Sequence, residues 1–282
     1  MKKLNIILLA FSLLLVSSAF TRPKGGNGDD VSNILQSIPS PIEISFLIKE
    51  ISSQYNGSSL NNPKFVENYT MSHKKALNLG IYSTDLGYAN LYEKNQDVIN
   101  YLDAVRSLAN GLNIGQFFDY DAVKKLASSS SNLPELLKQT QQNMDLINKH
   151  LKDQNRENMS ILILTGSWIE AMYLTTLVYE QTPNVKLKEK IGEQKIAVEQ
   201  IQKVLDFYKT QPNFEGIVAD MKQLSLVYSK ITIATSKGKS LLTESNGALV
   251  YNSDAVSSVQ ITDKDISLIT SLVKGVRGKM VK

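Results

Sequence analysis

The sequence predicts an all-α protein, built as a multi-helix bundle or as an array of helical hairpins. Three observations lead to this fold class. Apolar residues recur at alternating spacings of three and four along most of the chain, which is typical of amphipathic helices. Helix start signals precede several of these segments. The connections between them are short, and short connections favour antiparallel neighbours that pack at shallow angles.

The first 19 residues predict a cleavable signal peptide. Lys2 and Lys3 precede an apolar run, and the small residues at 17–19 (Ser-Ser-Ala) follow it. The run is too short for a membrane span and ends at a cleavage pattern. Because the chain contains no cysteine, a lipid anchor at the cleavage site is excluded. We therefore expect export to the periplasm or the medium, without a lipid anchor.

The rest of the chain divides into a mobile N-terminal segment, residues 20–39, and a single all-helical domain, residues 40–282. The first segment has glycine and proline but no apolar periodicity, as flexible tethers do. The domain opens on a helix start signal, in which Ser40 supplies a capping hydroxyl and Glu43 follows three residues later. We expect this helix to end near Tyr55.

Two further helices are predicted in the first half of the domain. Asn62 and Pro63 form a start signal, and the helix that they open is expected to continue through Tyr92. The next helix has apolar residues at helical spacing, namely Val98, Leu102, Val105, Ala109 and Leu112.

The helical period is most regular in the second half of the chain. Apolar stripes run over residues 133–151, 187–208 and 214–231. Thr262 then caps a last helix, whose apolar face carries Ile266, Ile269, Val273 and Val276.

One segment near the C-terminus interrupts the helical pattern. Asn246 and Gly247 lie between the apolar residues 241–242 and 248–251. A two-residue Asn-Gly turn between apolar runs favours a short β-hairpin. An ordered surface loop is the alternative.

Residues 158–179 are apolar on nearly every side, and Glu170 is their only carboxylate or amine. We interpret this segment as a central helix that the amphipathic helices surround. The alternative is a membrane span, which would carry Glu170 near its midpoint at a cost of about 2.5–3.5 kcal/mol. We expect no stable membrane span in the mature chain.

Residues 76–92 form a similar apolar stretch, in which Asp85 is the only charged residue. Small side chains in one helical column predict the close approach of a neighbouring helix, and this column comprises Ala76, Gly80, Ser83 and Gly87. The Gly-x-Tyr at Gly80 also echoes the Gly-x-Trp at Gly166, each with an acid downstream. This echo suggests two related halves as an alternative to an undivided domain.

Asp85 and Glu170 are the candidate site residues. A carboxylate inside a helical core must be hydrogen-bonded, protonated or paired. Arg106, at the margin of its apolar stripe, is the expected partner, and Tyr82 and Trp168 are expected to line the site. The site is either a structural ion pair or a binding or catalytic pocket, and we assign no catalytic residue.

Most catalytic and cofactor motifs are missing from the sequence. It has no Gly-x-Ser-x-Gly, no phosphate-binding or dinucleotide glycine pattern, and only His73 and His150 as histidines. We expect no metal site and no cofactor. Lysines alternate with acids in a chain of formal net charge +4, so nothing predicts a nucleic-acid binder.

Three features of the sequence are similar to those of a known group of proteins. They are the run Gly-Ser-Trp-Ile-Glu-Ala-Met-Tyr at 166–173, the export signal and the arginine-bearing last helix. In these features the chain resembles exported, all-helical proteins of unknown function from Bacteroidota-type bacteria. The resemblance implies an exported helical protein and no particular reaction or ligand.

Two functions follow from these expectations. The first is an exported, non-enzymatic helical binding or scaffolding protein of the cell envelope, with an unknown envelope protein as partner. The alternative is a small-ligand binder or hydrolytic enzyme that uses Asp85 and Glu170. An open pocket around these acids would favour the alternative, whereas a dry and paired core would favour the scaffold.

Overall fold

A computed structural model describes most of the chain. The described residues are 47–52, 54–121, 133–235, 240–245, 248–253 and 257–282. The predicted signal peptide, the predicted mobile segment and the start of the first predicted helix lie outside them. Residues 47–51 are helical, so that first helix ends before Tyr55.

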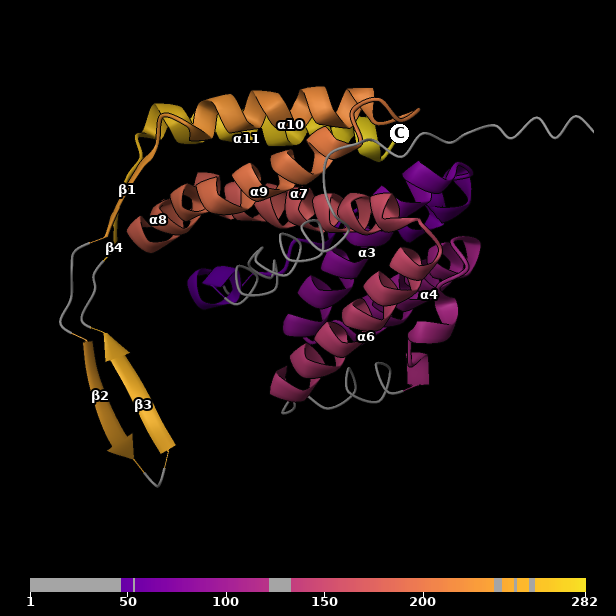
Figure 1. Cartoon of the computed structure of the whole chain (residues 1–282), viewed down its shortest axis with the longest axis horizontal. Helices are drawn as coiled ribbons and strands as arrows, with labels where there is room; N and C mark the ends of the chain where they lie inside the picture. The colour runs from indigo at the N-terminus through magenta and orange to yellow at the C-terminus, as the bar shows by residue number, and fades with distance from the viewer. Residues whose placement is uncertain (1–46, 53, 122–132, 236–239, 246–247, 254–256) are drawn as a thin grey trace, which may run out of the picture.

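The structure is mostly helical, which confirms the predicted fold class (Figure 1). The α-helices are α3 (Ser72–Leu91), α4 (Asn95–Gly111), α6 (Leu133–Asp153), α7 (Glu157–Gln181), α8 (Val185–Glu193), α9 (Lys195–Phe207), α10 (Glu215–Tyr228) and α11 (Asp263–Met280). The described residues also form the short 3₁₀ helices η1 (Gly57–Ser59), η2 (Pro63–Asn68) and η3 (Gly115–Phe117).

Helix α7 is the central helix, as the sequence predicts (Figure 1). It packs against α3 along much of its length and also contacts α6, α8, α9 and α11. Among the described helices, α7 alone is long and apolar enough to cross a membrane by length and composition, with a mean hydropathy of 1.5. Because 78% of that apolar window is buried by the rest of the protein, its side chains are those of a core helix.

Helices α3 and α7 approach each other most closely at two glycines. A Cβ on Gly80 would lie 2.0 Å from the carbonyl oxygen of Ile163, and one on Gly166 would lie 2.0 Å from that of Leu77. The predicted close approach is therefore confirmed at Gly80. It is wrong for Gly87, where a Cβ would meet nothing within 4 Å.

Two predicted helices are each divided in the structure, because tertiary contacts override local propensity. The helix expected to begin at Asn62 forms η2 and then α3, separated by the non-helical backbone of the buried Tyr69 (ψ 84°). The helix expected over 187–208 forms α8 and α9. They meet at Gln194, whose side chain accepts a hydrogen bond from the indole of Trp168 at 3.0 Å.

The helix ends follow local signals. Thr262 and Asp265 form the capping box of α11, which confirms the predicted cap. Asn113 and Asn155 follow α4 and α6 with φ of 58° and 55°. Asn tolerates this left-handed conformation better than most residues, so it ends helices in the way that glycine does.

The segment between α10 and α11 is a β ribbon with two antiparallel pairs. Strand β1 (Thr232–Thr235) pairs with β4 (Ser257–Gln260), and β2 (Ser240–Ser245) pairs with β3 (Ala248–Ser253). Ser245 lies opposite Ala248, so the predicted hairpin is confirmed, and its turn residues lie outside the described part.

The β ribbon makes α10 and α11 antiparallel neighbours. These two helices form an outer layer on α7 and α9 (Figure 1), with α10 against α9 and α11 against α7. The predicted apolar face of α11 is buried as expected, and its members are Ile266, Ile269, Val273 and Val276.

Candidate functional site

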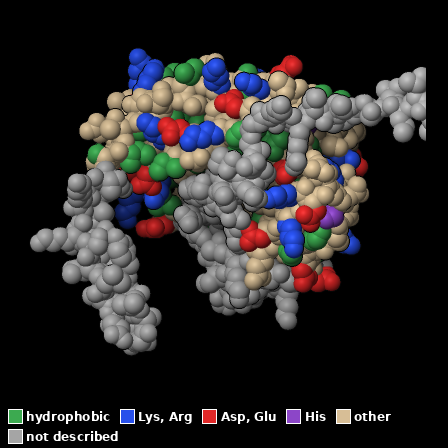
Figure 2. All heavy atoms as spheres, in the orientation of Figure 1, with side chains coloured by type: hydrophobic (Ala, Val, Ile, Leu, Met, Phe, Trp, Pro, Cys, Tyr) green, Lys and Arg blue, Asp and Glu red, His purple; other side chains and the backbone are tan. Residues whose placement is uncertain are grey.

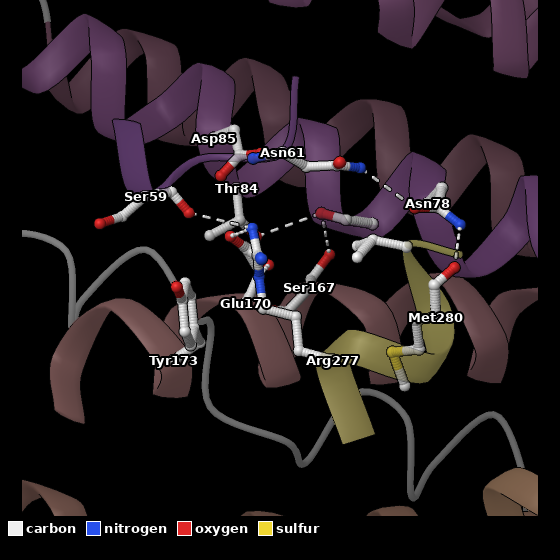
Figure 3. A network of polar contacts seen from close by, with 12 residues as sticks. Ser59, Asn61, Asn78, Thr84, Asp85, Ser167, Glu170, Tyr173, Arg277 and Met280 are labelled. Carbon is white, nitrogen blue, oxygen red and sulfur yellow. Dashed lines mark hydrogen bonds and ion pairs between the residues drawn. The ribbon is translucent and has the colours of Figure 1, made fainter. Parts of the chain in front are cut away.

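Asp85 and Glu170 do come together, and an arginine joins them. Asp85 lies on α3 and Glu170 on α7, and both are fully buried. Arg277 extends from α11 to Glu170 (Figure 3), with its Nε 2.5 Å from Oε2 and its Nη2 2.8 Å from Oε1. This bidentate pairing is the strongest geometry that an arginine and a carboxylate can form. We call these three residues the acid cluster.

The guanidinium of Arg277 is held on its other sides as well. It lies 4.1 Å from the ring centroid of Tyr173, within the range of a cation–π interaction. Its Nη2 also donates to the carbonyl oxygen of Ser59 at 3.2 Å. Burial alone would lower the pKa of Arg277, but the charge and hydrogen bonds of Glu170 outweigh it and raise the pKa above its ordinary value. Arg277 is therefore a fixed positive charge.

Asp85 is the second carboxyl group beside this single arginine. Burial raises the pKa of Asp85 well above its ordinary value, and the negative charge of Glu170 raises it further. The backbone N–H of Asn61 donates to Oδ2 at 3.1 Å, whereas Oδ1 accepts no hydrogen bond. A protonated Asp85 carries no charge, and burial beside the carboxylate of Glu170 favours this form. Arg277 then has one buried carboxylate, that of Glu170, to balance.

A polar network extends from the acid cluster to the end of α11 (Figure 3). The side-chain amide of Asn61 donates to Asn78 at 3.3 Å and to Tyr69 at 3.0 Å. Asn78 in turn donates to the carbonyl oxygen of Met280 at 2.9 Å, and Tyr69 donates to that of Val281 at 3.3 Å. The network therefore attaches the C-terminal helix to α3 and to the segment before it.

Hydroxyl groups join α3 and α7 next to the acids. Ser167 donates to the carbonyl oxygen of Gly80 at 3.1 Å, and Thr84 lies within 3.2 Å of the carbonyl oxygens of both Gly80 and Ser167. Such contacts are available only because the two glycines let the backbones approach. The crossing and the acid cluster thus form one continuous packed region.

The prediction that Arg106 pairs with the two acids is wrong. Arg106 is exposed on α4, where its guanidinium lies 5.2 Å from the ring centroid of Tyr120. Arg277 takes the predicted role instead. The apolar stripe of α11 could have indicated this, since Arg277 lies four residues after Val273 on the same helical face, where it turns toward α7.

The two predicted aromatic residues have different surroundings. Tyr82 is buried near Asp85, and its hydroxyl donates to the carbonyl oxygen of Asn62 at 2.9 Å. The indole N–H of Trp168 donates to the side chain of Gln194, and its ring packs edge-on against Tyr228, with the ring centroids 6.4 Å apart. Trp168 therefore supports the α8–α9 junction. Tyr173 and Asn61, which the sequence did not indicate, contact the acid cluster directly.

Surface hollows in the described part of the chain lie away from the acids. One, of about 470 Å³, is lined by Arg106, Tyr120 and Leu146 among others. Another, of about 580 Å³, lies between α10 and α11. Neither is lined by a residue of the acid cluster. Within the described residues, no group of three His, Asp or Glu side chains is placed to hold a metal ion.

Comparisons with known proteins identified no similar protein. No protein-family model matches the chain, and neither a curated protein nor a solved structure shows a significant match to it.

Proposed function

We propose that this chain is an exported, non-enzymatic helical protein that acts as a binding or scaffolding module of the cell envelope. The observation that carries the proposal is the closure of the acid cluster. Both carboxyl groups are fully buried, and Arg277 occupies both oxygens of Glu170. A substrate would have to displace a bidentate ion pair from a dry core, which is costly. The two acids thus interact with other residues of the fold instead of with a substrate.

Export rests on the amino-acid sequence. The basic start, apolar run and small-residue exit of the first 19 residues are typical of a secretory signal. We infer a periplasmic or extracellular protein without a lipid anchor.

The alternative, a small-ligand binder or hydrolase using Asp85 and Glu170, receives less support from this geometry. A general acid with a raised pKa is common in active sites, and Asp85 has one. However, a catalytic acid must reach its substrate, and no surface of Asp85 or Glu170 is exposed.

Export is tested by expressing the full chain in a Gram-negative host and separating cytoplasm, periplasm and medium. Mass spectrometry of the exported protein should find an N-terminus within a few residues of Thr21. Recovery of the intact chain from the cytoplasm alone would contradict the proposal.

The non-enzymatic role is tested by affinity capture from envelope extracts with three baits, wild type, Asp85→Asn and the exposed control Asp103→Asn. Because Asp85 is closed to solvent, all three should retain the same proteins and small molecules. Loss of one retained species with Asp85→Asn alone, at unchanged melting temperature, would favour the ligand-binding alternative.

A further inference from the structure

The α10/α11 layer contains an apolar hollow that is open to solvent. Each of these helices buries one apolar stripe, which for α10 comprises Ile217, Met221, Leu224 and Tyr228. Further apolar side chains line the hollow of about 580 Å³ between the helices, where Leu226 and Leu268 are exposed and Val227 and Leu272 also pack against the core. We call this hollow the α10/α11 groove. It is lined by Gln223, Leu226, Val227, Ser229, Lys230, Leu268, Ser271 and Leu272.

The apolar part of the groove is open to solvent. Leu226 is 53% exposed and Leu268 is 41% exposed, and Val227 and Leu272 are partly buried beside them. Single exposed leucines are ordinary on protein surfaces, but two exposed leucines that share one hollow with two partly buried apolar side chains indicate an interaction surface. The four side chains come from two antiparallel helices, so the groove runs between two parallel ridges.

The charge around the groove is positive. Lys230 lines it, and the exposed Lys222 and Lys264 lie one turn from Leu226 and Leu268 along their helices. Figure 2 shows hydrophobic, basic and acidic side chains side by side along the edge that α10 and α11 form. Within the described residues, no ion pair engages these three lysines.

The acids near the groove offset only part of this charge. Asp265 remains ionised, because the Thr262 hydrogen bonds and the nearby Lys230 and Lys264 lower its pKa. Asp220 pairs with Lys279 at 2.5 Å, and Glu180 pairs with Lys274 at 2.8 Å. Three lysines against the one carboxylate of Asp265 therefore leave the groove with an excess of positive charge.

We propose that the α10/α11 groove binds an acidic amphipathic helix of a partner protein. This inference rests on the proposed function and names the chemistry of the partner. The partner helix would place apolar residues, spaced at three and four, between the ridges of α10 and α11. Asp or Glu beside that stripe would face Lys222, Lys230 and Lys264.

Two other occupants fit this surface less well. In a symmetric dimer each groove would face its own copy, which brings the lysines of the two copies together. A lipid surface is broad and flat, whereas the groove is a narrow hollow between two ridges. A single helix with complementary charge satisfies both the shape and the sign of the surface.

The test measures fluorescence anisotropy of labelled synthetic helices with the full-length exported protein. One peptide of about 20 residues carries a leucine stripe flanked by glutamates. A second has lysines in place of the glutamates, and a third has the first composition in scrambled order. We expect the glutamate peptide to bind at least about tenfold more tightly than either control, and to weaken as salt rises.

Variants of the groove locate the binding. Leu226→Ser with Leu268→Ser, and separately Lys222→Glu with Lys230→Glu, should each weaken glutamate-peptide binding at least about tenfold. Because all four side chains are exposed, melting curves should confirm that these variants fold. The matched controls Ile196→Ser, which is 49% exposed on α9, and Lys149→Glu should bind like wild type.

Several results would overturn the proposal. These are equal affinity for the glutamate and lysine peptides, binding that the groove variants leave unchanged, or no binding at about 1 mM peptide. Co-sedimentation with phosphatidylglycerol vesicles that the leucine variant abolishes would assign the groove to lipid. A dimer in analytical ultracentrifugation that the same variant dissociates would assign it to a second copy. If the protein is exported in all these cases, the groove proposal fails while the proposed function stands.

Discussion

Helix α11 takes part in both the acid cluster and the α10/α11 groove, and it presents opposite faces to them. Toward α7 it places Arg277, whose guanidinium pairs with Glu170 inside the core. Toward solvent it places Leu268, which is 41% exposed. The charged residue is thus largely covered, with 12% of its side chain exposed, and the apolar residue is open, the reverse of the usual distribution.

The two regions differ in whether their side chains already have partners. In the acid cluster Arg277 pairs with both oxygens of Glu170, the backbone of Asn61 donates to Asp85, and both carboxyl groups are closed to solvent. In the groove, Leu226 and Leu268 are exposed, and the described residues form no ion pair with Lys222, Lys230 or Lys264. A buried ion pair is typical of structure, and an exposed apolar hollow is typical of binding. The difference supports a structural role for the first region and agrees with the binding that we propose for the second.

The largest expected effect comes from removing the arginine of the acid cluster. Arg277→Ala would leave Glu170 buried without its partner, which costs about 3–5 kcal/mol of unfolding free energy. Urea denaturation measures this loss. Arg106→Ala is the matched control, since Arg106 is exposed and its contact with Tyr120 is worth about 0.5–1 kcal/mol. Equal losses in the two variants would remove the distinction between the two arginines.

The next largest effect is expected where α3 and α7 cross. Gly80→Ala places a methyl group 2.0 Å from a backbone oxygen of α7, so the helices must separate. We expect a loss at the upper end of the range for overpacking, about 3 kcal/mol. Gly87→Ala has open space in the same helix and should gain about 0.5–1 kcal/mol. Similar melting temperatures for the two variants would contradict the close approach of α3 and α7 at Gly80.

A pH series tests the protonation of Asp85. Since folding raises the pKa of Asp85, the folded protein keeps a proton that the unfolded chain releases above about pH 3.9. The contribution of Asp85 to stability is therefore fully present below that pH and is lost as pH rises through its folded pKa.

Asp85→Asn keeps the shape of the side chain and is uncharged at every pH, so it does not titrate. Its stability relative to wild type should therefore increase as pH rises, which urea midpoints at several pH values can measure. The exposed control Asp103→Asn should follow the wild-type pH profile. A constant difference between Asp85→Asn and wild type would mean that Asp85 is not protonated in the fold.

The smallest expected effect on stability is in the groove. Leu226→Ser and Leu268→Ser change exposed side chains, so each should alter the unfolding free energy by less than about 0.5 kcal/mol. Thermal melts of the single variants check this. A loss of several kcal/mol would mean that these leucines belong to the core, and the contrast between the two regions would disappear.

The amino-acid sequence predicted the elements better than their junctions. Hydrophobic period and caps are local signals, and they located α4, α6, α10 and α11, including the cap at Thr262. The break at Gln194 has a tertiary cause. There Trp168 donates to Gln194, and a Cβ on Gly192 would lie 2.4 Å from a methyl group of Val259 on β4. No local pattern contains these contacts.

The candidate site was predicted in part for the same reason. Two acids in apolar helices had to be buried and compensated, so Asp85 and Glu170 could be identified from composition alone. Their partner depends on which helix lies across α7 and in what register. Arg106 and Arg277 both lie beside apolar stripes, and only the packing of α11 on α7 distinguishes them.

The most direct test of the structural role of the acid cluster is a double-mutant cycle between Glu170 and Arg277. Urea unfolding would be measured for Glu170→Gln, Arg277→Met and both together, all in an Asp85→Asn background so that Asp85 cannot replace Glu170. We predict that each single change is strongly destabilising and that the double loses less than their sum, with a coupling of at least about 2 kcal/mol. Losses that add within about 0.5 kcal/mol would contradict a structural ion pair.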